Sequence, residues 1–281
     1  LYVSTFDVAG NESNKVEVQV DAQAPQPPVI VNQSTNNTRP TITGTAEADS
    51  AIRMTVNGVV YTATTDSNGA WSATVTNTLP DNTYTVSATA TDAALNVSAP
   101  GTGSLLVDAT APEAPTINDL ITNDTTPTIT GTAEAGSTVT ITVGTDVYTD
   151  IADGDGNWSI LSNVLGEAVY VVRATATDVL GNESAQATGS LEIDITNPAD
   201  PVVTYVSATE MVGTATADIY VQVYRSNGTT KVANTYADSS GDYTISFNPI
   251  RTHNETLYVS TFDVAGNESN KVEVQVDAQA P

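Results

Sequence analysis

The sequence predicts an all-β protein built from tandem seven-stranded β-sandwiches in an extended array, and three observations support this prediction. A short acidic segment that ends in proline recurs at spacings of 87, 86 and 83 residues, which indicates modules of similar size. Between these segments, apolar and polar residues alternate in short runs that turn-forming residues separate. No stretch shows sustained helical periodicity. We call the recurring segments the hinges: Asp21-Ala-Gln-Ala-Pro25, Asp108-Ala-Thr-Ala-Pro112, Asp194-Ile-Thr-Asn-Pro198 and Asp277-Ala-Gln-Ala-Pro281.

The first module is expected over residues 22–108. Asn57-Gly58 is a strong signal for a tight hairpin between two of its strands. The run 84–91 alternates, which predicts one buried and one exposed face. Seven strands at this spacing fit a sandwich of immunoglobulin type, here without a disulfide because the chain has no cysteine. The expected strands cover residues 29–31, 41–47, 52–56, 59–64, 71–75, 84–91 and 103–107.

The second module, residues 109–194, repeats this pattern, and the third, residues 195–281 with its terminal hinge, has diverged more. Tyr243 stands where the other modules have Trp71 and Trp158, and all three aromatic side chains are expected in the cores. Strands of the second module are expected over residues 128–134, 138–142, 158–160, 170–177 and 189–193.

Residues 1–25 are identical to residues 257–281. Residues 1–21 are therefore expected to form the C-terminal strand pair of a preceding module. A two-stranded fragment of this kind is only marginally stable by itself in water.

Charge narrows the classes of partner. The chain has 33 acidic and 8 basic residues and a formal net charge of −25, so it lacks the basic face that nucleic-acid binding needs. Hydrophobic residues still make up 40% of the chain, more than a disordered acidic tail would contain. No apolar run reaches the ~18 residues of a membrane helix, so membrane insertion is not expected. This balance favours cations as partners.

Strand direction places many acidic residues at one end of each module. If the first strand runs away from the preceding hinge, the loops after strands two, four and six return to that hinge. Carboxylates that converge there would repel one another unless a cation lay between them, and Ca²⁺ accepts roughly six to eight oxygen ligands in flexible geometry. We therefore predict calcium sites at the module junctions. The expected ligands are Asp7, Asp21, Glu47, Asp92, Asp108, Glu134, Asp178, Asp194, Asp218, Asp263 and Asp277.

Turn formation is the competing explanation for several polar residues. Asp66, Asp153 and Asp238 each begin an Asp-x-x-Gly turn, and we favour the turn role for them. Residues 153–157 resemble the start of an EF-hand loop but lack the glycine that should follow, so we interpret them as a hairpin turn. One asparagine shares each acidic loop, and for it the roles of turn former and ligand both remain open. These residues are Asn11, Asn96, Asn182 and Asn267.

No catalytic site is expected. His253 is the only histidine, and a lone histidine in a loop is more often a surface residue than a general base. The sequence has no cysteine nucleophile, zinc-ligand spacing, phosphate-binding loop or Gly-x-Ser-x-Gly elbow. We therefore predict that the chain is not an enzyme.

Three motifs resemble a known family. They are Thr41-Ile-Thr-Gly-Thr-Ala-Glu47, the run Ala-Thr-Ala-Thr-Asp-x-x-Gly-Asn-Glu-Ser over residues 174–184, and the Asp-x-Thr-Ala-Pro form of the hinge. Together they resemble the bacterial immunoglobulin-like repeats of giant secreted adhesins, in particular biofilm-associated proteins of the Bap type. The resemblance covers the whole chain. It implies type I secretion, display on the extracellular bacterial surface, and calcium ions that stiffen the module junctions.

These observations lead to an expected function. The modules would be structural stalk repeats of a cell-surface adhesin that support cell adhesion and biofilm formation, with calcium and neighbouring modules of the same chain as partners. The alternative is that the repeats themselves bind a surface glycan or identical modules on other cells. Their Thr- and Ser-rich surfaces would allow this, although the sequence shows no aromatic platform for a sugar.

Overall fold

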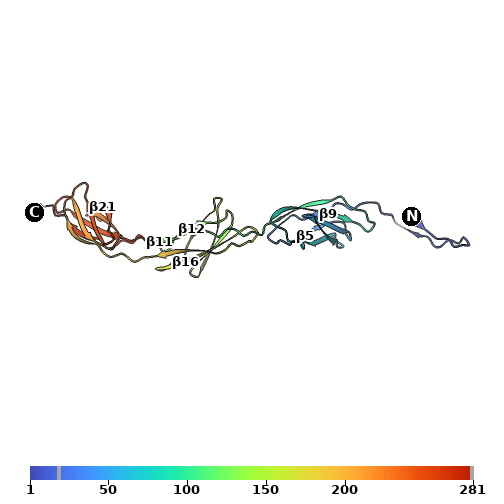
Figure 1. Ribbon diagram of the computed structural model, residues 1–281, viewed down its shortest axis with the longest axis horizontal. Coiled ribbons are helices and arrows are strands. Elements are labelled where there is room, and N and C mark those ends of the chain that lie inside the picture. The colour runs from blue at the N-terminus through green and yellow to red at the C-terminus, as the bar shows by residue number, and fades with distance from the viewer. Residues whose placement is uncertain (18–19, 279–281) are drawn as a thin grey trace. The chain divides into compact units, whose positions relative to one another are not determined.

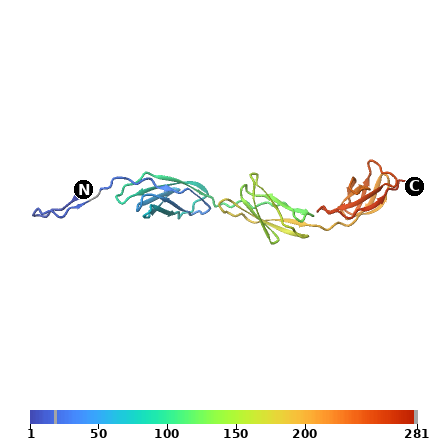
Figure 2. The same ribbon diagram turned by 180° about the vertical axis from the view of Figure 1, so that it is seen from behind.

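The computed structural model describes residues 1–17 and 20–278, and this part of the chain consists of strands and turns without a helix. It accordingly contains no helix that could cross a membrane. Residues 279–281 of the terminal hinge lie outside the described residues. The chain divides into two compact units, Leu1–Pro112 with Thr177–Glu183 and Glu113–Ala176 with Ser184–Pro281. Figures 1 and 2 show the strands gathered into separate sandwiches, which confirms the predicted tandem all-β class.

The first module pairs a three-stranded sheet, in the order β3-β5-β8, with a five-stranded sheet, in the order β4-β10-β9-β6-β7. The opening strand expected at residues 29–31 is divided between the sheets, because β3 pairs antiparallel with β5 while β4 pairs parallel with β10. The strands are β3 (Val29–Ile30), β4 (Gln33–Thr35), β5 (Thr41–Thr45), β6 (Ala51–Val56), β7 (Val59–Thr64), β8 (Ala70–Thr74), β9 (Asn82–Thr91) and β10 (Gly101–Val107).

Local sequence explains two features of this module. Asn57 and Gly58 adopt φ values of 48° and 75° between the directly paired Val56 and Val59, so the predicted two-residue hairpin is confirmed. Strand β9 alternates as predicted, and its inward residues include Val86, Ala88 and Ala90, each at most 1% exposed.

The second module has the five-stranded sheet β11-β17-β16-β13-β14 facing the pair β12-β15. The turn over residues 153–157 joins β14 to β15, which lie in different sheets. Our interpretation of this segment as a hairpin turn was therefore wrong, since it crosses between the sheets. The strands are β11 (Leu120–Thr122), β12 (Thr128–Thr132), β13 (Thr138–Val143), β14 (Asp146–Ile151), β15 (Asn157–Leu161), β16 (Ala168–Thr177) and β17 (Ala187–Ile193).

The third module packs the sheet β18-β19-β22 against the sheet β21-β20-β23-β24, and residues 1–17 form a separate two-stranded sheet, β1-β2. The strands are β1 (Tyr2–Val3), β2 (Val16–Glu17), β18 (Val202–Val206), β19 (Glu210–Thr214), β20 (Tyr220–Arg225), β21 (Lys231–Tyr236), β22 (Asp242–Ser246), β23 (Thr256–Phe262) and β24 (Val272–Gln275).

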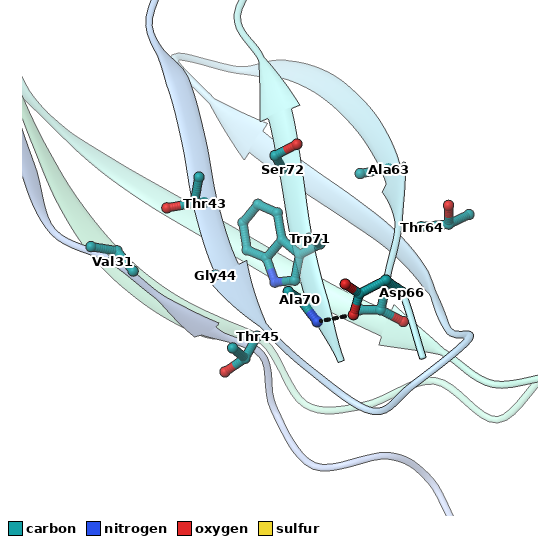
Figure 3. A pocket seen from close by; sticks show the side chains of 11 residues that line it. Val31, Thr43, Gly44, Thr45, Ala63, Thr64, Asp66, Ala70, Trp71 and Ser72 are labelled. Carbon is teal, nitrogen blue, oxygen red and sulfur yellow. Dashed lines mark hydrogen bonds between the residues drawn. The ribbon is translucent and has the colours of Figure 1, made fainter. Parts of the chain in front are cut away.

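Each sandwich core contains a glycine directly opposite an aromatic residue on the neighbouring strand. In the first module Gly44 pairs with Trp71, which is 3% exposed, and Figure 3 shows the indole ring directed toward this glycine. A Cβ atom at Gly44 would lie 2.5 Å from the ring and 2.2 Å from the carbonyl oxygen of Val29, so only glycine fits there. The equivalent pairs are Gly131 with Trp158 and Gly213 with Tyr243.

Candidate metal sites at the module junctions

The loop after β9 is tied to the first hinge by one asparagine. Asn96 donates its backbone N–H to Oδ1 of Asp92 at 2.8 Å and its side-chain Nδ2 to Oδ2 at 2.9 Å. The same Nδ2 also donates to the backbone carbonyl of Asp21, 3.2 Å away. We call this arrangement of an aspartate, the asparagine four residues later and a hinge carbonyl the Asp–Asn clip.

The clip recurs at the next two hinges. Asn182 Nδ2 donates to Asp178 at 2.7 Å and to the carbonyl of Asp108 at 2.9 Å. In the third module Asn267 Nδ2 bridges Asp263 and the carbonyl of Asp194, at 2.9 and 2.8 Å. In each of these loops the asparagine amide thus has two roles. It stabilises the turn through the aspartate, and it connects the loop to the hinge through the backbone carbonyl.

The hinge carboxylates do not take part in the clips. Oδ1 of Asp21 accepts the backbone N–H of Gln23, 3.0 Å away. Asp108 and Asp194 make the same contact two residues downstream, at 3.2 and 3.0 Å. This is the local turn that aspartate commonly forms with its own backbone. The backbone carbonyl of each hinge aspartate therefore accepts a hydrogen bond from the following module. Its carboxylate accepts one from the backbone of the hinge itself.

Two further acidic residues, which the sequence analysis did not identify, accept hydrogen bonds from hinges. Each lies in the module that precedes its hinge. Asp81, just before β9, accepts the backbone N–H of Ala109 at 2.8 Å and the hydroxyl of Thr110. Glu167, just before β16, accepts the hydroxyl of Thr196 at 2.7 Å. One sequence feature could have indicated these contacts. The second and third hinges have threonine two residues after the hinge aspartate, whereas the first hinge has glutamine there.

The remaining predicted ligands are distributed over several surfaces. Asp21 and Glu47 line one shallow groove, and Asp218 and Asp263 line another. Glu134 lines a groove with Glu113, in a different compact unit from Asp108 and Asp178.

Two predicted ligands lie near the chain ends. Both oxygens of Asp7 accept hydrogen bonds from Asn11, so its loop repeats the aspartate–asparagine part of the clip. Asp277 places Oδ1 3.6 Å from Nδ1 of His253, and its backbone N–H bonds to the carbonyl of Val206.

Hydrogen bonds keep the clip carboxylates of Asp92 and Asp178 ionised. The side chain of Asn96 lowers the pKa of Asp92 below its usual range, and burial opposes this effect only in part. At Asp178 burial pushes the pKa up, but hydrogen bonds from Asn182 and from backbone N–H groups outweigh it and the pKa is lowered. The hydroxyl of Thr110 likewise lowers the pKa of Asp81. Each carboxylate therefore carries its negative charge at neutral pH.

The clip offers the donor chemistry that calcium uses, although with fewer carboxylates than expected. Within residues 1–17 and 20–278, no three Asp, Glu or His side chains come together closely enough to hold a metal. Each clip instead gathers one carboxylate, one side-chain amide and one backbone carbonyl. A half-turn of the amide would present its oxygen where Nδ2 now lies, giving three oxygen donors of the kinds that bind Ca²⁺. The donor types fit this ion.

Family models match nearly the whole chain. One described as "Bacterial Ig-like domain" matches residues 30–109 and 114–195, and one described as "Bacterial Ig domain" matches residues 197–278. Neither describes a catalytic family. No curated protein matches.

Solved structures that are similar to this chain include two bacterial adhesins and one domain of a biofilm-associated protein. A Ca²⁺-stabilised adhesin that helps an Antarctic bacterium bind ice is 22% identical, with 99% of this chain and 81% of that chain covered and a TM-score of 0.41. A 1.5-MDa bacterial ice-binding adhesin is 19% identical, with 90% and 99% covered and a TM-score of 0.37. The BSP domain of a biofilm-associated protein is 15% identical, with 92% and 67% covered and a TM-score of 0.27. At these identities and scores the likenesses carry no functional inference.

Proposed function

Because this chain belongs to the bacterial Ig-like domain family, we propose that it is a series of structural repeats from a bacterial cell-surface adhesin. The sandwiches act as spacers that hold an adhesive part of the protein away from the cell and thereby support adhesion and biofilm formation. The protein is exported, by type I secretion, and works outside the cell. A net charge of −25 suits this role, since it keeps neighbouring copies soluble and apart.

The observation that carries the proposal is that each of two hinges is hydrogen-bonded on both sides. The hinge at residues 108–112 is held by Asp81 before it and by Asn182 after it. The hinge at residues 194–198 is held by Glu167 and Asn267 in the same way. Proline further restricts the backbone of each hinge. These hydrogen bonds and the proline restrain the backbone of each connection, which is what a spacer requires.

We further propose that calcium occupies the clips in a calcium-rich environment. The carboxylate of Asp92, the amide oxygen of Asn96 and the carbonyl of Asp21 would hold one ion, with Glu47 lining the groove beside it. The corresponding residues of the next two modules would hold the others. When bound, the ion supplies positive charge that joins a loop of one module to its hinge. Extracellular calcium modules bind at about 10⁻⁴–10⁻³ M, so millimolar calcium would fill such sites.

Calcium binding by the full chain tests this proposal. We expect equilibrium dialysis to detect bound calcium, and chelator to lower the thermal midpoint and to shorten the particle in X-ray scattering. The variant Asp178→Asn removes one clip carboxylate and should lose one bound ion. The matched control Asp66→Asn changes an aspartate that accepts the N–H groups of Asn68 and Ala70 in a turn, and should retain all ions. Equal calcium stoichiometry in both variants, or no binding at all, would refute the calcium proposal.

Direct binding between repeats remains the second candidate function. The Thr- and Ser-rich surfaces of the modules would allow it. Aggregation of beads coated with the chain would measure this activity. Glycan binding stays a prediction from the sequence.

A further inference from the structure

Three aromatic side chains form a row across one sheet of the third module. Tyr220 of β20 lies directly opposite Tyr236 of β21 on one side and Phe262 of β23 on the other. Their neighbours in sequence Val221 and Thr261 are fully buried in the sandwich. Because successive side chains of a strand point to opposite faces, the three rings lie outside the core. We call these three residues the aromatic row, which strand pairing assembles from distant parts of the sequence.

Small or aliphatic residues occupy the corresponding positions of the first two modules. In the first module, Ala51 at the start of β6 lies opposite Thr64 and Thr91. In the second, Thr138 at the start of β13 lies opposite Ile151. The sandwich therefore does not require aromatic residues at these positions, and the aromatic row needs a separate explanation.

The middle ring of the row meets each neighbour at a steep angle. The ring centres of Tyr220 and Tyr236 are 5.2 Å apart with an interplanar angle of 63°, and those of Tyr220 and Phe262 are 6.1 Å apart at 61°. Such pairs stabilise a sheet, yet Tyr236 remains 67% exposed. All three rings line one groove of about 350 Å³, so ring surface is available to a ligand.

A buried amide holds the middle ring in position. The hydroxyl of Tyr220 donates to Oε1 of Gln222 at 3.2 Å. Gln222 is 1% exposed, and its Nε2 donates to the backbone carbonyl of Ala233 at 2.6 Å. A ring that is ordered before a ligand arrives lowers the entropy cost of binding.

Two carboxylates line the same groove as the three rings. Asp218 is exposed in the turn before β20. Asp263 follows β23, and its two oxygens accept hydrogen bonds from Asn267. Lys231 lines a second hollow of about 300 Å³, which shares the three rings and Asp263. The carboxylates outnumber this lysine, and the net charge of −25 adds to the attraction for a cation.

We propose that the aromatic row binds a quaternary ammonium group of the choline type. Aromatic faces attract such a cation through their quadrupole, and several rings around one ammonium group are the usual means of recognising it. Asp218 and Asp263 supply the opposite charge beside the rings. The same module already places an ammonium group over a ring, since Nζ of Lys271 lies 4.4 Å from the centre of the Tyr224 ring.

Calorimetric titration of the full chain with choline in calcium-free buffer tests this proposal. The matched titrant is the neutral isostere of choline, in which a tert-butyl group replaces the trimethylammonium group. We expect choline to bind and the isostere to bind at least about tenfold more weakly, because only choline carries the charge. Equal affinity for the two titrants, or no choline binding, would overturn the proposal. Because calcium is absent, neither result bears on the calcium proposal.

Substitutions assign the binding to the aromatic row. Tyr236→Leu removes the most exposed ring and should weaken choline binding about tenfold. The matched control Tyr205→Leu replaces a tyrosine of β18 that is 53% exposed, and should leave the affinity unchanged. Equal affinities in these two variants would show that choline does not bind at the row.

Two further variants test the role of charge. Asp218→Asn keeps the shape of the side chain but removes its charge, and should weaken choline binding. Lys231→Gln removes the positive charge beside the rings and should strengthen it. Weaker binding in Lys231→Gln would contradict a cationic ligand.

The ammonium group can belong to a soluble molecule or to a lipid headgroup, and vesicles distinguish these sources. Cosedimentation of the chain with phosphatidylcholine vesicles, lost in Tyr236→Leu, would assign the headgroup. Choline binding without cosedimentation would assign a soluble ligand, and either result supports the site. Cosedimentation that persists in Tyr236→Leu would count against it, because the aromatic row would then not be the contact.

Discussion

The first and third modules differ in the aromatic ring that packs on an equivalent strand glycine. Trp71 lies on Gly44 in the first module, and Tyr243 lies on Gly213 in the third. The ring nitrogen of Trp71 is buried and has no hydrogen-bond partner among the described residues. Tyr243 instead extends its hydroxyl to 3.4 Å from the carbonyl of Val202 on the opening strand.

This difference shows which part of the contact is fixed. A Cβ atom would meet the backbone carbonyl of the opening strand at 2.2 Å at both Gly44 and Gly213, so the bare backbone is required in each case. The ring can vary provided that it is flat and large enough to cover the glycine. A ring over a strand glycine compensates for the packing that the missing side chain would have supplied.

Adding one methyl group to the glycine should have the largest effect. In Gly44→Ala the new Cβ would lie 2.2 Å from the Val29 oxygen and 2.5 Å from the Trp71 ring, so strand or ring must shift. We expect a loss of about 3 kcal/mol from the unfolding free energy of the first module. For a module of this size, the thermal midpoint should fall by roughly 10 °C or more. Tryptophan fluorescence during thermal unfolding measures this change. Gly213→Ala should affect the third module similarly, and circular dichroism follows it because that module has no tryptophan.

Gly154→Ala is the control for this substitution. Gly154 has no atom within 4 Å of an added Cβ and no positive φ, so the change should stay within about 0.5 kcal/mol. Equal midpoints for Gly44→Ala and Gly154→Ala would show that the ring–glycine contact does not limit stability.

Alkaline pH should separate the two modules next. Burial raises the pKa of Tyr243 from 10.0 to about 12, whereas the indole of Trp71 does not titrate. Burial and the neighbouring Glu268 raise the pKa of Tyr224 to about 12 as well. Since unfolded tyrosine ionises near pH 10, its contribution to the folded state is complete below pH 10 and is lost as the pH rises toward about 12.

The third module should therefore lose thermal stability over that interval more steeply than the first. Circular dichroism follows all modules during unfolding, and tryptophan fluorescence reports only on the first two. Tyr243→Phe should reduce the alkaline slope of the third module. An unchanged slope in this variant would assign the pH dependence to other groups.

The sequence predicts the parts of this comparison that depend on short segments. Alternation and turn chemistry placed the strands and the Asn57-Gly58 hairpin, and the recurrent aromatic positions Trp71 and Tyr243 were correctly assigned to the cores. The sequence did not explain why the Thr-Ile-Thr-Gly-Thr motif contains glycine. The aromatic ring that requires this glycine lies on a strand more than 20 residues away.

The candidate site was predicted less completely for the same physical reason. Acid-rich loops beside hinges could be inferred from strand direction. The sequence could not predict which group the Asp108 carboxylate would bond to. Backbone N–H groups of the hinge and polar groups of the neighbouring loop could both donate to it, and in the structure the N–H of Thr110 does. The role of Asp81 depends on a contact with Thr110 across 29 residues of sequence, which no local pattern encodes. The assignment of calcium ligands remains a prediction.

The smallest expected effect concerns the clip loops of the same two modules. Leu95 holds a φ of 74° in the first module, where the third has Gly266 at 93°. A left-handed conformation costs a residue other than glycine about 1–2 kcal/mol, while glycine adds roughly 0.5–1 kcal/mol of chain entropy to the unfolded state. Leu95 is 80% exposed, so its removal sacrifices little packing. Leu95→Gly should therefore stabilise the first module by about 0.5 kcal/mol.

The reverse exchange sharpens this last comparison. Gly266→Ala should destabilise the third module by about 1 kcal/mol through its φ alone, since the added Cβ would meet its nearest atom, Nδ2 of Asn123, at an ordinary 3.7 Å. Chemical denaturation of both variants measures the two changes, and hydrogen exchange at the N–H of residue 95, which bonds to the Asp92 carbonyl, localises the first. Destabilisation by Leu95→Gly would mean that the leucine side chain holds the clip loop in place, so that the two loops reach the same hydrogen bonds by different means.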